Sequence, residues 1–67
     1  MVNNNLLKAR MIEKGYNQNK LAEAMAVSKQ SMSYRFNEKY DWTLSEIRQI
    51  KELLNLKPKD IIDIFFI

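Results

Sequence analysis

The sequence of 67 residues contains no cysteine and no histidine, and it has only one glycine and one proline. Without cysteine the chain can form neither a disulfide nor a thiolate metal site. The scarcity of glycine and proline favours helices over a β-sandwich, which needs many turns. No apolar run approaches the ~20 residues of a membrane-spanning helix, and the first residues lack the pattern of a secretion signal. The sequence therefore predicts a cytoplasmic protein with no membrane partner.

Elements of known catalytic sites are also missing from the sequence. No serine lies in a nucleophile-elbow sequence, and there is no glycine-rich phosphate-binding loop. Asp60 and Asp63 lie three positions apart on one expected helix, but among apolar neighbours and without a third ligand they make a poor metal site. We therefore expect that the protein is not an enzyme, uses no cofactor or metal, and binds no small-molecule ligand.

The positive charge of the chain is unevenly distributed. The net charge is +3, and residues 1–40 hold seven basic and three acidic residues, whereas residues 41–67 hold four basic and five acidic ones. A protein that binds nucleic acid needs such a basic surface, although an excess of this size indicates it only weakly.

Apolar spacing and capping residues predict a compact all-α fold of five helices in one domain that spans residues 1–67. The expected helices cover about 3–14, 18–25, 28–37, 44–54 and 58–66. Gly15 and Asn55 are expected to end helices, and Thr43 and Glu46 to form a capping box. The side chains expected to face inward are Leu6, Ala9 and either Ile12 or Met11 in the first helix, and Leu44, Ile47, Ile50, Leu53 and Leu54 in the fourth.

Residues 17–37 predict two short helices joined by a tight turn, which is a helix-turn-helix. Met32 and Phe36 lie four positions apart and share the face that the second helix must bury. Val27 lies in the connection and can fill the angle between the helices, and Ser28 can cap the second helix.

The outer face of this second helix carries no acidic side chain. Apart from Met32 and Phe36, every residue from 28 to 37 is Lys, Gln, Ser, Tyr, Arg or Asn. Such groups suit the edges of base pairs and the flanking phosphates. The alternative is an ordinary solvated surface from which Asp and Glu are absent by chance.

The joint spacing of these residues resembles the helix-turn-helix of lambda-type phage repressors and Cro proteins. The resemblance covers nearly the whole chain and implies a five-helix, lambda repressor-like domain. It also implies a transcriptional regulator that binds double-stranded DNA as a homodimer on a palindromic operator, in a bacterial host cell or its nucleoid. The matching positions are Asn17, Gln18, Leu21, Ala22, Met25, Val27, Ser28, Gln30, Ser31, Met32, Phe36 and Asn37.

The same resemblance assigns roles to individual residues. It implies that Gln18 contacts a phosphate and steadies the recognition helix, that this helix faces the major groove, and that the loop after it touches the DNA backbone. The expected DNA-binding residues are Asn17, Gln18, Lys29, Gln30, Ser31, Ser33, Tyr34, Asn37 and Lys39.

Three residues depart from the pattern of that family. Ala26 stands where the turn favours glycine, so we expect a strained or slightly different turn, at a cost of roughly 1–2 kcal/mol. Arg35 replaces an apolar residue, so Phe36 must fill more of the core. Glu38 replaces a glycine and brings an acid close to the expected phosphate, which weakens the assignment of Asn37 and Lys39.

The segment 61–67 is apolar at six of its seven positions, which is more apolar surface than a small core needs. One interpretation is a dimer interface, since exposed apolar patches tend to mark partners. Another is that Phe65 packs on the first helix while the last residues fray. In a third interpretation, the protein has the same fold but is a protein-interaction module, such as an anti-repressor, whose apolar C-terminal segment binds another protein. The residues expected in a dimer interface are Ile62, Phe65, Phe66 and Ile67.

Three further residues also have two interpretations. Arg10 could pair inside the domain or be solvated, and Lys39 could reach a phosphate or be solvated. Trp42 could stack on a ligand or base, but a staple contact with Ile47 in front of the capped helix is favoured.

Overall fold

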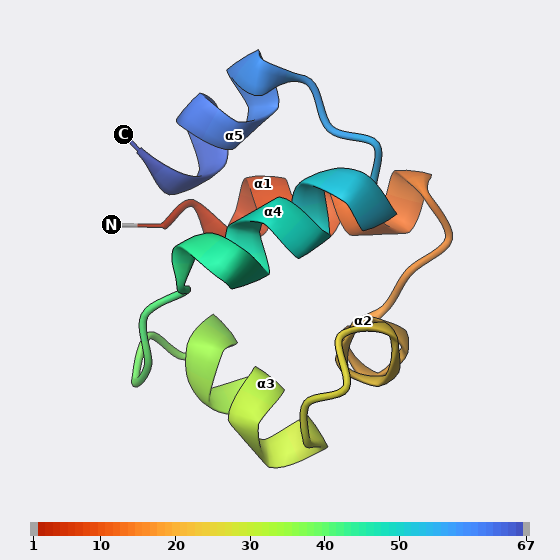
Figure 1. Cartoon of the computed structure of the whole chain (residues 1–67), viewed down its shortest axis with the longest axis vertical. Helices are drawn as coiled ribbons and strands as arrows, with labels where there is room; N and C mark the ends of the chain where they lie inside the picture. The colour runs from red at the N-terminus through yellow and green to blue at the C-terminus, as the bar shows by residue number, and fades with distance from the viewer. Residues whose placement is uncertain (1, 67) are drawn as a thin grey trace.

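The computed structural model describes residues 2–66, which form five α-helices and no strand (Figure 1). The described chain is compact, with principal extents of 28 × 24 × 20 Å. The expected all-α fold of five helices is therefore confirmed, with helix bounds slightly shorter than expected. The helices are α1 (Asn4–Glu13), α2 (Gln18–Ala24), α3 (Lys29–Phe36), α4 (Leu44–Leu53) and α5 (Pro58–Phe65).

Polar side chains start the first four helices as the sequence predicts. Among the three asparagines before α1, Asn3 is the cap, and its Oδ1 accepts a hydrogen bond from the Leu6 N–H at 3.1 Å. At α4, Thr43 and Glu46 accept hydrogen bonds from each other's backbone N–H, which confirms the capping box. These bonds satisfy N–H groups that the first turn of a helix leaves free.

Helix ends coincide with residues in the left-handed backbone region. Gly15 after α1 has φ +80° and Asn55 after α4 has φ +50°, so both predicted stops are confirmed. Glu38 after α3 has φ +61°, and Ala26 after α2 has φ +57°. Glycine is the residue that adopts this conformation without steric cost, so Ala26 and Glu38 are strained there.

The buried face of α1 lies one residue further along than expected. Leu7 and Met11 are buried, Leu6 is half-buried, and Ala9 and Ile12 are exposed. Met11, the alternative to Ile12, is confirmed as an inward-facing residue, whereas the expectations for Ala9 and Ile12 were wrong. Positions 6, 9 and 12 and positions 7 and 11 both have helical spacing, and the packing of α1, which contacts α5, decides between them. On α4, Ile50 is buried as expected, but Leu44 in the first turn is exposed.

Three aromatic rings join the ends of α3 and α5. Trp42 is buried and lies edge-on to Phe36 at 5.5 Å and to Phe65 at 6.2 Å between ring centroids. Phe65 is therefore a core residue of the chain, and its assignment to a dimer interface was wrong. Because α5 packs on the core by one face, Phe65 and Ile64 are buried, whereas Ile62 and Phe66 are exposed.

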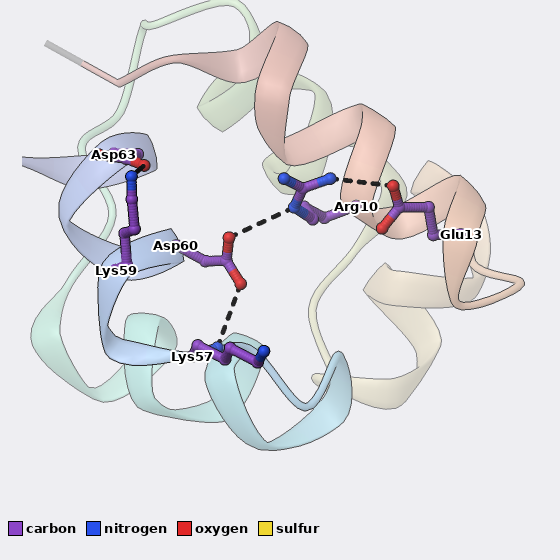
Figure 2. Close-up of polar contacts among 6 residues, drawn as sticks. All are labelled: Arg10, Glu13, Lys57, Lys59, Asp60 and Asp63. Carbon is purple, nitrogen blue, oxygen red and sulfur yellow. Dashed lines mark hydrogen bonds and ion pairs between the residues drawn. The ribbon is translucent and has the colours of Figure 1, made fainter.

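An ion-pair network ties α1 to α5, as Figure 2 shows. The Arg10 guanidinium lies between Glu13, at 2.9 Å, and Asp60, at 3.4 Å, so Arg10 pairs inside the domain. The second carboxylate oxygen of Asp60 accepts the Lys57 backbone N–H at 3.2 Å and so caps α5. That hydrogen bond and the one from Arg10 outweigh the desolvation of the group, and they hold the pKa of Asp60 below its ordinary value.

Candidate nucleic-acid interface

Helices α2 and α3 pack against each other and are joined by the four residues 25–28 (Figure 1). The Met25 N–H donates to the Leu21 carbonyl at 3.0 Å, and the Val27 N–H donates to the Ala22 carbonyl at 3.0 Å. The positive φ of Ala26 lets the chain reverse between these two bonds. The connection therefore has the sharp turn that a helix-turn-helix requires.

The inner face of α3 is anchored in the core. Met32 is fully buried and Phe36 is 7% exposed. The Ser28 hydroxyl accepts the Ser31 N–H at 3.0 Å and caps the first turn. At the other end, the Asn4 side-chain amide donates to the Phe36 carbonyl at 2.9 Å, which ties α3 to the start of α1. These contacts fix the direction of the helix before any partner binds.

The outer face of α3 is open to solvent. Lys29 and Gln30 are exposed, and Ser31, Ser33 and Tyr34 are partly exposed. No acidic residue lies within α3, whose sequence is KQSMSYRF. Gln30, Ser33 and Tyr34 lie within about 100° of one another around the helix axis and share the outer face, whereas Lys29 and Ser31 lie at its two sides.

Two of these side chains are already bonded to each other. Gln30 Nε2 donates to the Tyr34 hydroxyl at 2.7 Å, one helical turn further on. The Tyr34 ring also has Lys39 Nζ at 5.3 Å from its centroid and the Tyr40 ring edge-on at 5.3 Å. The loop after α3 is therefore packed onto the outer face of α3, and Tyr40 belongs to this cluster.

The loop from 37 to 41 adds further polar groups next to α3. Asn37 Nδ2 donates to the Ser33 hydroxyl at 3.2 Å, so these two expected site residues form a second pair. The Lys39 N–H donates to the Tyr34 carbonyl at 2.8 Å, which keeps Lys39 beside the helix. Glu38, which lies between Asn37 and Lys39 in the sequence, is exposed and adds a negative charge to this loop.

At the start of α2 the two expected residues differ in their surroundings. Asn17 Oδ1 accepts the Lys20 N–H at 2.8 Å, so this oxygen is used to cap α2. Gln18 is half-buried in the first turn and lines a small hollow of about 190 Å³ together with Met11, Tyr16 and Phe36. Gln18 thus borders the same hollow as Phe36, the last residue of α3, and its expected contact with a phosphate stays a prediction.

A largely buried ion pair holds α3 against α4. Arg35 Nη2 lies 2.6 Å from Glu46 Oε2, and Arg35 Nη1 donates to the Ser31 carbonyl at 3.0 Å. Burial raises the pKa of Glu46, but the hydrogen bonds from Arg35 and Thr43 together with the positive charge of Arg35 outweigh it, so the pKa lies below its ordinary value. The sequence predicts Glu46 only as a member of the capping box and misses this role. The unusual Arg at position 35 was the signal that could have pointed to an acidic partner.

Comparisons with known proteins show a family but no individual relative. No curated protein and no solved structure matches the chain. Among the described residues, no helix combines the length and the apolar character that crossing a bilayer would need. Residues 3–67 match the model of a family described as "Protein of unknown function (DUF739)", and the chain therefore belongs to that family.

Proposed function

We propose that the protein is a sequence-specific regulator of transcription that binds double-stranded DNA, of the Cro or repressor kind, and acts as a dimer on a palindromic operator. The observation that carries this proposal is the two-sided character of α3. Its inner face is held by Met32 and Phe36, and its outer face offers hydrogen-bonding side chains without an acid. A helix of this kind, after a sharp turn from a packed neighbour, fits the major groove.

The side chains on this face suit distinct parts of a duplex. Lys29 at the start of α3 can donate to guanine, and Gln30 offers an amide to a base edge. Gln18 and the loop with Asn37 and Lys39 flank the helix, where phosphates of the two strands pass. The proposed mechanism is steric, because a dimer that fills two successive major grooves about 34 Å apart keeps polymerase from the same DNA.

The surface of α5 supports the dimer. Ile62 and Phe66 are 56% and 59% exposed, although both are apolar. Phe66 also borders a hollow of about 420 Å³ that is lined by Val2, Tyr40 and Leu44, among others. A two-fold axis brings the same patch of each copy together, so each Phe66 can enter the hollow of the other copy. Ile67, which we also expected in this interface, lies outside the described residues.

A selection from random duplexes tests the proposal. The chain is bound at low salt to a pool of duplexes with a randomised centre, and the bound pool is sequenced over several rounds. We expect a two-fold symmetric consensus whose half-sites are about one helical turn apart. Enrichment of no sequence would contradict the proposal.

A second candidate is a protein-interaction module such as an anti-repressor. The exposed Ile62 and Phe66 favour it, because an apolar patch can as well cover a different protein. The two candidates differ in a gel-shift experiment with random duplex DNA at low salt. A regulator binds at least weakly through its positive charge, whereas a pure interaction module does not.

A further inference from the structure

We infer that Tyr34 is a positioning residue that fixes the side-chain amide of Gln30 so that it reads adenine in the major groove. This inference rests on the proposed function and goes beyond it, because it names the base and the residue that enforces the choice. It starts from the contact of 2.7 Å between Gln30 Nε2 and the Tyr34 hydroxyl on the exposed face of α3.

The Tyr34 hydroxyl is a fixed partner because the ring that carries it is held on two sides. Lys39 Nζ lies 5.3 Å from the ring centroid, and the Tyr40 ring meets it edge-on at 90°. The backbone N–H groups of Lys39 and Tyr40 both donate to the Tyr34 carbonyl, at 2.8 and 3.4 Å, and this keeps the loop in place. Without such a partner, the long side chain of Gln30 would rotate freely at the surface. The held Tyr34 hydroxyl therefore restricts the orientation of the Gln30 amide.

The hydrogen bond decides what the Gln30 amide can still offer. One N–H of Nε2 is used by Tyr34, which leaves one N–H donor and the Oε1 acceptor. Adenine presents an N6 donor next to the N7 acceptor, so it matches both remaining groups. Guanine presents two acceptors, O6 and N7, and would need both N–H groups of the amide. Thymine and cytosine each offer one matching group, so adenine alone satisfies the amide fully.

The test uses four versions of the selected operator, which carry the four different base pairs at one position. That base pair is identified as the one at which Gln30→Ala loses base preference. We expect the wild-type protein to bind the adenine duplex about 10- to 100-fold more tightly than the guanine duplex. In Tyr34→Phe this ratio should fall by about five-fold, because a free glutamine loses more side-chain freedom on binding and can turn toward guanine.

Tyr40→Phe is the matched control, since it removes a hydroxyl from the neighbouring ring and leaves the Gln30–Tyr34 bond intact. It should keep the wild-type ratio. A second readout needs no DNA: in ¹H–¹⁵N spectra the side-chain amide signals of Gln30 should shift in Tyr34→Phe and not in Tyr40→Phe.

The outcomes separate this inference from the proposed function. If the wild-type protein selects no sequence, both fail together. If it selects one but the base at the Gln30 position is not adenine, or Tyr34→Phe keeps the full ratio, only the inference is overturned. Equal weakening of all four duplexes by Tyr34→Phe would also overturn it, because Tyr34 would then contact the DNA backbone.

Discussion

Arg35 on α3 and Glu46 on α4 form an ion pair of 2.6 Å although only 15% and 12% of their side chains are exposed. The two oxygens of Glu46 have separate partners, since Oε1 accepts the Thr43 N–H at 2.9 Å and Oε2 faces Arg35. One carboxylate thus caps α4 and also holds α3. The orientation of α3 depends on a contact that lies behind the proposed DNA-binding face.

Glu46→Gln should therefore destabilise the protein. The substitution keeps the shape of the side chain but leaves the largely buried Arg35 charge without its counter-ion, which costs about 3 kcal/mol. Urea unfolding followed by circular dichroism measures the free energy of unfolding. Glu52→Gln, on the exposed side of α4, is the control and should change it by less than about 0.5 kcal/mol. Equal stability of the two variants would mean that the ion pair does not stabilise the fold.

The stability of the protein should fall in acid. The pKa values of Glu46 and Asp60 are lowered in the folded state, so their ionised forms favour folding. This contribution is fully present above the ordinary carboxyl pKa values of 4.5 and 3.8, and it is lost as the pH falls through the lowered folded values. Urea unfolding at a series of pH values from 7 to below 4 measures this. The loss should be smaller in Glu46→Gln, and an unchanged pH profile would contradict the assignment.

Ala26→Gly should stabilise the protein. Ala26 has φ +57°, where a Cβ costs roughly 1–2 kcal/mol, and the added freedom of glycine in the unfolded chain offsets part of the gain. The expected net gain is about 0.5–1 kcal/mol in the free energy of unfolding. Ala24→Gly, the same substitution at the last residue of α2, should instead cost about 0.5 kcal/mol. Destabilisation by both variants would show that the turn does not strain Ala26.

Lys29→Ala should flatten the salt dependence of DNA binding. If Lys29 neutralises a phosphate near the groove, its removal lowers the slope of log Kd against log salt by about one. Fluorescence anisotropy with a labelled duplex at several salt concentrations measures the slope. Lys51→Ala, an exposed lysine on α4, is the control and should leave it unchanged. An equal change in both variants would indicate that only net charge matters.

Phe66→Glu should weaken self-association. Phe66 is 59% exposed, so the fold does not need it, but a charge there would enter the proposed interface. Loss of an apolar anchor of this kind costs about 2 kcal/mol, or roughly a 30-fold rise in the dimer Kd. Sedimentation equilibrium measures that Kd. Ile12→Glu places the same charge on an apolar side chain of α1 that is 75% exposed, and it should leave the dimer intact. Equal association of Phe66→Glu and the wild type would remove α5 from the interface.

Local features of the fold were predictable from the sequence because neighbouring residues determine them. The Ser28 cap and the Thr43 capping box depend on residues three positions apart. The stop at Gly15 also follows from a single position, whereas the positive φ of Ala26 was expected only from the resemblance to lambda-type repressors. The exposure of the polar side chains on α3 was predictable for the same reason, since one short helix supplies most of them, while their contact with DNA stays a prediction.

Features that depend on contacts between helices were not predictable in the same way. The pair of Arg35 and Glu46 joins residues eleven positions apart, and the cap at Thr43 already accounted for Glu46. The buried face of α1 depends on where α5 docks, and spacing alone fits two registers. Phe65 seemed available for a partner because the ring of Trp42 that covers it comes from a distant loop.

The central claim is that the outer face of α3 contacts duplex DNA, and a titration of ¹⁵N-labelled protein with the selected duplex tests it most directly. The account predicts that the backbone amide signals of Gln30 and Tyr34 move on binding, while that of Lys59 at the start of α5 stays in place. Unmoved signals of Gln30 and Tyr34 at saturating DNA would contradict it.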